Sequence, residues 1–201
     1  QIIIPILPYC RTPGRQAERE CYDCSPLSWK GNLAMCGICG EMRFDGRAVE
    51  GSLLERMNSR LERRGPDDAG LFIDGSTGFG HRRLSVIDLS DKSHQPMVDE
   101  ELDLVLVFNG AIYNYRELRA ELREKGYSFF SEGDSEVILK AYAEWGEDCT
   151  LQLHGMFAFA VWDSRNRSLF LARDRLGIKP LYYYLSQDHR ILIFGSELKA
   201  I

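Results

Sequence analysis

The chain has 201 residues, of which 44% are hydrophobic, 11% aromatic and 27% charged. These proportions are typical of a globular protein and exclude global disorder and a fibrous repeat, and no apolar run reaches the roughly 18 residues of a membrane span. Twenty-five basic and thirty acidic residues give a net charge of −5, which argues against a nucleic-acid or anionic-membrane binder and favours small-molecule or protein partners.

The first 34 residues differ in composition from the rest of the chain. They hold four prolines and three cysteines and show no sustained period of 2 or 3.6. They also lack the basic start and the small-residue cleavage site of a signal peptide. We therefore expect residues 1–35 to be a disordered leader, residues 36–201 to form one domain, and the protein to be cytoplasmic.

The first half of this domain is predicted to contain strands and one helix. Residues 37–44 alternate loosely in polarity and end at an Asp-Gly turn, which predicts a strand. Ser52 and Glu55 form a capping-box pattern that predicts the start of a helix ending before Gly65. Short strands are then predicted at residues 69–73, 78–83 and 104–108.

The second half is predicted to hold two helices followed by four strands. The helices are expected at residues 115–125, capped by Asn114, and 135–145, with Gly126 and Gly146 as their terminators. The strands are expected at residues 156–163, 168–173, 181–185 and 191–195. Because their links are too short for parallel crossovers, the pattern favours an α+β fold with antiparallel sheets in which these late strands form a meander.

Two Cys-x2-Cys pairs offer four thiols, Cys21 with Cys24 and Cys36 with Cys39. Four thiolates would satisfy tetrahedral zinc, but the eleven residues between the pairs are fewer than usual for such a site. Cys39 also fits a small buried hydrophobic residue. We favour the interpretation without a metal and keep the zinc site as an alternative.

A set of sequence blocks in fixed order gives a more specific indication. MCGI at 35–38 is followed by RGPDDAG at 64–70, GHRRLSVIDLS at 80–90, QPM at 95–97, FNGAIYNY at 108–115, GDSEV at 133–137, GMFAFAVWD at 155–163, RDRLGIKPLYY at 173–183 and GSELKAI at 195–201. Residues 36–201 thereby resemble the class II glutamine amidotransferases, more narrowly the amidotransferase half of the glutamine-hydrolysing asparagine synthetases. The resemblance implies a four-layer αββα N-terminal-nucleophile hydrolase sandwich with antiparallel sheets.

The resemblance also implies a catalytic cysteine at position 36. A thiol with a pKa of about 8.5 needs a base, and a free α-amino group with a pKa of about 7.7–8.0 can supply one within the same residue. Attack on the side-chain amide of glutamine creates an oxyanion, for which Asn109 and Gly110 offer two donors after an apolar segment. Family resemblance assigns these two residues and Cys36 to catalysis.

Glutamine itself carries a carboxylate and an ammonium group that need opposite charges. By resemblance Arg83 binds the carboxylate and Asp134 the ammonium, and the guanidinium fork suits a carboxylate well. Taken alone, Arg83 could be a surface charge and Asp134 the N-cap of the third helix. The same pocket is expected to be lined by Leu84, Ser85, Val86, Ile87, Asn109, Gly110 and Ala111.

The resemblance implies no cofactor for this domain. In the family, a C-terminal synthetase domain uses ATP and Mg²⁺ to activate a carboxylate and receives the ammonia, and we expect that domain to be missing from this chain. The acceptor is expected to be aspartate, giving asparagine, with an N-acetylglutaminylglutamine dipeptide as an alternative. A non-catalytic zinc-binding or regulatory module is a different alternative, and a homodimer is one option for the oligomeric state.

Two features depart from the family pattern. Cys36 is preceded by 35 residues, so its nitrogen is a non-basic amide unless the leader is absent; we favour translation from Met35 over a self-cleaved propeptide. Ala111 stands where these synthetases commonly have glutamate. Its backbone can still line the pocket, so we expect the glutaminase chemistry to survive.

Overall fold

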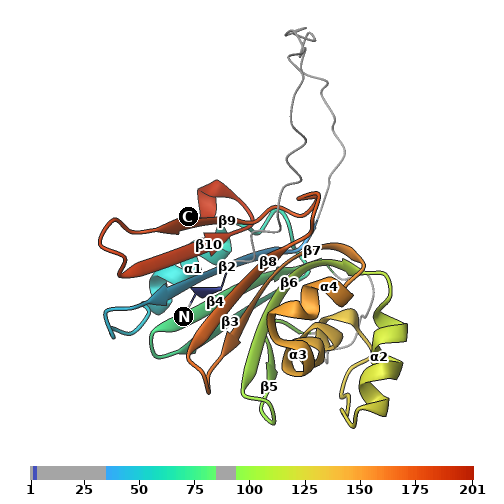
Figure 1. The fold of residues 1–201 in the computed structure, drawn as a ribbon. Helices are drawn as coiled ribbons and strands as arrows, with labels where there is room; N and C mark the ends of the chain where they lie inside the picture. Colours follow the sequence, from blue (N-terminus) through green and yellow to red (C-terminus); the bar gives the residue numbers. More distant parts are fainter. Residues whose placement is uncertain (1, 4–34, 85–93) are drawn as a thin grey trace, which may run out of the picture.

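The computed structural model describes residues 2–3, 35–84 and 94–201 (Figure 1). Its helices are α1 (Gly51–Ser59), α2 (Tyr115–Glu124), α3 (Asp134–Trp145) and α4 (Cys149–Gln152), with short 3₁₀ turns η2 (Gly146–Asp148) and η3 (Leu198–Ala200). Its strands are β1 (Ile2–Ile3), β2 (Gly37–Arg43), β3 (Asp68–Asp74), β4 (Thr77–Arg83), β5 (Met97–Asp99), β6 (Leu104–Ile112), β7 (Gly155–Asp163), β8 (Ser168–Arg173), β9 (Tyr182–Leu185) and β10 (Ile191–Gly195).

The strands form two five-stranded sheets. The first sheet has the order β1-β8-β7-β6-β5 and the second the order β3-β4-β2-β10-β9. The pairs between described strands are antiparallel except for β1 with β8, which is parallel. The prediction of antiparallel sheets is therefore confirmed for residues 35–84 and 94–201.

The two sheets face one another, and helices cover their outer faces (Figure 1). One hydrophobic cluster lies between the sheets and includes Ile38, Phe79, Val107 and Phe194. A second joins α2 and α3 to the first sheet, and a third joins α1 to the second sheet. These clusters confirm the predicted four-layer αββα arrangement, and each draws its members from residues 38–200.

The alternation of side chains along β6 explains how one strand serves two layers. Val105 and Val107 point into the cluster between the sheets, whereas Leu104, Leu106 and Phe108 pack toward α3. The strand is apolar on both faces because both faces are covered. Asn109 continues the row of Val105 and Val107, so the strand carries it to the end of the space between the sheets.

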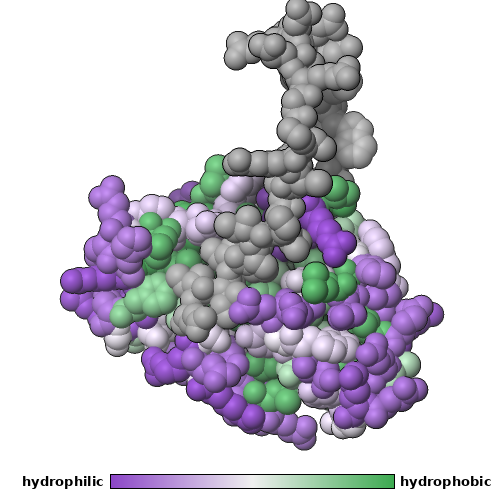
Figure 2. All heavy atoms as spheres, viewed as in Figure 1, coloured by the Kyte–Doolittle hydropathy of each residue, from purple (hydrophilic) through white to green (hydrophobic). Residues whose placement is uncertain are grey.

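The surface of α2 shows the pattern of a helix with one buried stripe. Leu118 and Leu122, one turn apart, are buried in the cluster that α2 shares with α3 and the first sheet. On the visible face in Figure 2, the α2 region at the lower right is mostly hydrophilic, with isolated hydrophobic residues. None of the helices in the described segments combines the length and the hydrophobicity of a membrane-spanning helix.

Two local predictions were wrong. The last four strands do not form one meander, since β7 and β8 belong to the first sheet and β9 and β10 to the second. The capping box at Ser52 is also wrong: Glu50 occupies the N-cap of α1 without a side-chain hydrogen bond, and Ser52 lies inside the helix. Within the described segments, sequence analysis also missed β5, α4, the 3₁₀ turns and β1, whose pairing with β8 places Ile2 and Ile3 of the expected disordered leader in the first sheet.

The cap predicted at Asn114 is right in position but not in chemistry. Asn114 is the N-cap of α2, yet its side chain makes no cap hydrogen bond. Its amide instead donates to Gln152 O at 2.9 Å, and its oxygen accepts from His154 N at 2.9 Å. Asn114 therefore ties the start of α2 to the segment that leads into β7.

A buried histidine connects the two sheets. His81 of β4 is 1% exposed, and its Nε2 lies 3.2 Å from the carbonyl oxygen of Phe108 in β6. Burial lowers the pKa of His81 to about 3, so the ring is neutral at pH 7 and Nε2 donates the hydrogen bond. This contact joins the two sheets next to Asn109.

We expect His81 to make the fold sensitive to acid. The unfolded histidine binds a proton near pH 6.5, whereas the folded one resists protonation until about pH 3. Lowering the pH from about 6.5 should therefore reduce the free energy of unfolding by up to about 1.4 kcal/mol per pH unit. Urea unfolding at pH 7, 6 and 5 measures this slope.

The matched variants for this measurement are His81→Gln and His154→Gln. The glutamine amide at position 81 can still donate to Phe108 O but does not titrate, so the slope should flatten. His154 is exposed, and its replacement should leave the slope unchanged. An equal slope in wild type and His81→Gln would contradict this assignment.

Candidate active site

Cys36 lies at the mouth of the space between the sheets, immediately before β2. Its Sγ accepts a hydrogen bond from Leu84 N at 3.4 Å and lies 3.5 Å from Leu84 O, which can accept from the thiol. Arg64 Nε donates to the carbonyl oxygen of Cys36 at 3.0 Å. The half-buried thiol is thus held by the backbone of Leu84, and the main chain of Cys36 by the Arg64 guanidinium.

Opposing effects act on the Cys36 thiol. Burial raises its pKa, whereas the backbone hydrogen bond from Leu84 and the charges of Arg83, Lys179 and Arg64 lower it. For Cys39 and Cys149, burial raises the pKa to about 12. Burial is the largest of these effects and the pKa of Cys36 lies above its ordinary value, but of the described cysteines Cys36 is the one on which three cations act.

Asn109 and Gly110 lie near the end of β6. Asn109 is 1% exposed, and its buried Nδ2 has no hydrogen-bond partner among the described residues. A buried amide without a partner is unfavourable unless a ligand completes it, so this group is suited to stabilise a developing negative charge. A Cβ on Gly110 would lie 2.2 Å from the carbonyl oxygen of Met156, which explains the glycine there.

Asp134 is the first residue of α3, and Gly133 rather than Asp134 occupies the N-cap. Its Oδ2 accepts a hydrogen bond from Ile112 N at 2.9 Å, which attaches α3 to the end of β6. The carboxyl group is 5% exposed, and burial raises its pKa. Arg119 donates to the neighbouring Gly133 O at 2.7 Å and contributes positive charge.

The structure brings the predicted residues together in two groups. Arg83 ends β4 and, with Leu84, adjoins Cys36. Asn109, Gly110 and Ala111 share β6, to which Asp134 is bonded. The hydrogen bond of His81 to Phe108 O connects these groups, whereas the predicted lining residues Ser85, Val86 and Ile87 lie outside the described residues.

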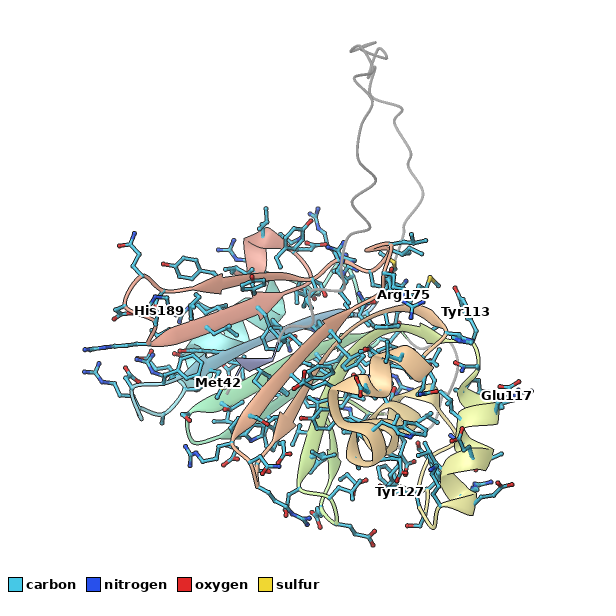
Figure 3. All side chains as sticks on the ribbon, in the orientation of Figure 1. Met42, Tyr113, Glu117, Tyr127, Arg175 and His189 are labelled. Atoms are coloured by element: carbon cyan, nitrogen blue, oxygen red, sulfur yellow. The ribbon has the colours of Figure 1, made fainter. Side chains whose placement is uncertain are left out.

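The end of the sandwich that holds these groups is visible in Figure 3. Tyr113, which follows β6, and Arg175, which follows β8, lie at this end, while Met42 and His189 lie at the other. The chain positions of Cys36 before β2 and Arg83 at the end of antiparallel β4 place them at one end of the second sheet. The site is therefore built where strands of both sheets end.

Sequence analysis did not single out three side chains at this end. Arg64 holds the Cys36 carbonyl, and Gln95 accepts from Phe108 N at 2.6 Å through its Oε1. Lys179 is 7% exposed and interacts electrostatically with Cys36. Each lies within a motif that was recognised, but nothing in the local pattern separates these polar residues from solvated ones.

The described residues contain no group of three or more His, Cys, Asp or Glu side chains placed to hold a metal ion. Cys21 and Cys24 of the alternative zinc site lie outside the described residues, as does most of the predicted leader. Cys39 is fully buried among apolar residues, in agreement with its interpretation as a small hydrophobic residue.

Comparison with known proteins identifies the same region. The model of the family described as "Glutamine amidotransferase domain" matches residues 35–201. Asparagine synthetase [glutamine-hydrolyzing] 3 of Bacillus subtilis is 44% identical over 170 residues, covering 83% of this chain and 27% of that protein. A putative asparagine synthetase of Methanocaldococcus jannaschii is 44% identical over 188 residues, covering 83% and 35%. The chain thus spans about a third or less of these relatives.

A solved structure has a similar fold. Glutamine phosphoribosylpyrophosphate amidotransferase of B. subtilis superposes with a TM-score of 0.67 at 20% identity, covering 82% of this chain and 42% of that one. At this identity the likeness concerns the fold, and it confirms the predicted sandwich.

We expect iodoacetamide to distinguish the described cysteines. At pH 8 and in the native protein, Cys36 should be alkylated at least tenfold faster than Cys39 and Cys149, because the thiolate reacts and the last two are buried with pKa values of about 12. Peptide mass spectrometry of trypsin digests measures each site. Alkylation in urea, where all should react alike, is the control, and equal native rates would contradict the expectation.

Proposed function

Because this chain belongs to the glutamine amidotransferase domain family, we propose that it hydrolyses L-glutamine to L-glutamate and ammonia. The observation that carries the proposal is that one end of the sandwich holds two groups. They are the Cys36 thiol, hydrogen-bonded to Leu84 N, and the buried side-chain amide of Asn109, whose Nδ2 has no partner among the described residues. A nucleophile and an oxyanion donor at the same end of the sandwich are the parts that acyl transfer needs.

In the proposed reaction the α-amino group of Cys36 accepts the thiol proton. The sulfur then attacks the side-chain carbonyl carbon of glutamine, and the carbonyl electron pair becomes an oxyanion. The Asn109 amide and the Gly110 N–H donate to this oxygen, each such donor being worth about 3–4 kcal/mol. Collapse of the intermediate releases ammonia, which takes up the proton, and leaves a thioester.

Water completes the cycle. It adds to the thioester carbonyl while the α-amino group again accepts a proton, and the oxyanion donors act a second time. Cleavage of the carbon–sulfur bond gives glutamate and returns the proton to sulfur. Both halves use the same groups, so removal of the Cys36 sulfur should abolish the whole reaction.

Substrate orientation is proposed to rest on two opposite charges. Arg83 would bind the α-carboxylate of glutamine through its guanidinium fork, and Asp134 would bind the α-ammonium group. The 5% exposure of Asp134 and its anchoring to Ile112 N support a fixed carboxylate rather than a solvated one. Leu84 and Ala111, together with Ser85, Val86 and Ile87, are proposed to line the pocket.

This mechanism requires a free amino group on Cys36, so the active form is proposed to begin there. Translation from Met35 followed by removal of that methionine would supply it, as would cleavage of a propeptide. Within residues 35–84 and 94–201, the three hydrophobic clusters run from Ile38 to Ala200, which supports folding of a chain that starts at Cys36 and lacks the two-residue edge strand β1.

The ammonia is proposed to serve an ATP-dependent amidation. The relatives named above are asparagine synthetases of much greater length, so the partner would be a synthetase region that uses ATP and Mg²⁺ and amidates aspartate. An acetylated glutamine dipeptide is the alternative acceptor. These steps are assigned to residues outside 36–201.

The central test is glutamine hydrolysis by a chain expressed from Met35, with intact mass confirming Cys36 as the first residue. We expect ammonia and glutamate in equal amounts from this chain, and a loss of at least about 1,000-fold in Cys36→Ala. The 201-residue chain that retains residues 1–35 should be inactive. Ammonia release that persists in Cys36→Ala would overturn the proposal.

The role of Asp134 is tested by its amide variant. Asp134→Asn keeps the shape and the hydrogen bond from Ile112 N but removes the charge, so the KM for glutamine should rise about 10–100-fold, in line with about 1.5–3 kcal/mol for a charge-assisted contact. Asp148→Asn, on an exposed turn, is the matched control. An unchanged KM in Asp134→Asn would remove this residue from substrate binding.

A further inference from the structure

Lys179 is a buried cation that forms no ion pair with the carboxylates of residues 35–84 and 94–201. Its side chain is 7% exposed, and no carboxylate of the described residues lies within 4.0 Å of its ammonium group. Its Nζ instead donates to the thioether sulfur of Met35 at 3.2 Å. Burying an ammonium group beside so weak an acceptor is costly, so its retention calls for a function.

The connection between β8 and β9 is built to hold this side chain. The carboxylate of Asp174 accepts hydrogen bonds from the backbone nitrogens of Phe157, Leu176, Ile178 and Lys179, at 2.9–3.2 Å. Arg173 closes the same turn by donating to Gly177 O and to Lys179 O, at 2.5 and 2.8 Å. Gly177 has φ +64°, and a Cβ there would lie 2.8 Å from the Arg173 guanidinium.

Three cations from different elements surround Cys36. Arg83 approaches from β4, Arg64 from the segment after α1, and Lys179 from the β8–β9 connection, and all three lower the pKa of the thiol. Arg83 is proposed above to bind the substrate carboxylate, and Arg64 holds the Cys36 carbonyl. Of these three cations, Lys179 is therefore the one whose charged group is assigned neither to the substrate nor to the backbone of Cys36.

The carboxylates at this end offset that charge only in part: burial and Arg64 lower the pKa of Lys179, and Asp174 raises it. Asp174 is engaged by backbone N–H groups, and Glu197 lies 3.3 Å from Arg64 and 2.7 Å from Lys199. His81, which also lies near Arg83, is neutral at pH 7. The charged groups facing Cys36 from each packed element thus leave a net positive environment.

We propose that Lys179 is a positioning residue whose fixed ammonium group keeps the α-amino group of Cys36 unprotonated at neutral pH. This inference rests on the proposed function. Removal of Met35 would take away the present contact of Lys179 Nζ, and the new α-amino group would belong to the residue next to that contact, on whose thiol Lys179 already acts. A neighbouring positive charge disfavours the ammonium form of that group.

The effect matters because the amine must accept a proton. An α-amino group with its ordinary pKa of about 7.7–8.0 is mostly protonated at pH 7, and only the neutral fraction can act as the base. A lower pKa raises that fraction several-fold. The same charge stabilises the thiolate, so it favours both the neutral α-amino group and the ionised sulfur of Cys36.

The experiment measures kcat/KM for glutamine against pH in chains that begin at Cys36, for wild type, Lys179→Met, Lys179→Arg and Lys125→Met. The acid limb is the low-pH side of this profile, where kcat/KM falls as the α-amino group becomes protonated. In Lys179→Met the midpoint of the acid limb should move to higher pH by at least about 0.5 unit, and kcat/KM at pH 6.5 should fall about threefold or more. Lys179→Arg should restore the wild-type acid limb, and Lys125→Met, at the exposed C-cap of α2, should not move it. A purely structural role would lower activity without moving the limb.

A second measurement uses the full 201-residue chain and does not depend on turnover. There the nitrogen of Cys36 is an amide, so Lys179→Met should act on the thiol alone and slow its alkylation at pH 8 by about twofold or more. If wild type hydrolyses glutamine but Lys179→Met changes neither the acid limb nor the alkylation rate, the role of Lys179 is refuted. If wild type beginning at Cys36 releases no ammonia, the proposed function fails, and the alkylation rate still decides whether Lys179 acts on the thiol.

Discussion

The site depends on the spacing between two sheets, and the hydrogen bond from His81 to the carbonyl oxygen of Phe108 fixes that spacing next to Asn109. Cys36 and Arg83 belong to one sheet, whereas Asn109 belongs to the other. An error of about 1 Å between the proposed nucleophile and the proposed oxyanion donor would be enough to weaken catalysis strongly. A neutral, buried imidazole that links the sheets limits their relative movement, and it adds no charge to a site that already holds several cations.

The distribution of charge follows the demands of the proposed substrate. Positive charge gathers around Cys36, where a thiolate and an oxyanion would develop, while the buried carboxylate of Asp134 stands apart at the first turn of α3. Backbone groups hold both regions, since Leu84 N contacts the sulfur and Ile112 N contacts Asp134. Such preorganised dipoles need little rearrangement during the reaction, which is how oxyanion stabilisation becomes effective.

The sequence predicts the layers and the strands of residues 36–201 better than their assembly. Strand periodicity located β6 and β7, because their apolar residues face two covered surfaces, but it could not indicate that the chain passes from one sheet to the other between β8 and β9. Helix starts failed at Ser52, where tertiary contacts rather than a cap fix α1. Family motifs supplied Cys36, Arg83, Asn109 and Asp134. Lys179 could not be found this way, since only the structure reveals that its charge is buried.

The burial of α3 has a consequence for dynamics. From Asp134 to Tyr142 every residue of this helix is buried, whereas α2 exposes one face to water. The peptide hydrogens of α3 can therefore exchange with solvent only through large-scale opening of the domain. The carboxylate that is proposed to select the amino acid thus stands at the start of a helix that is expected to exchange slowly, and its position should persist until the domain itself melts.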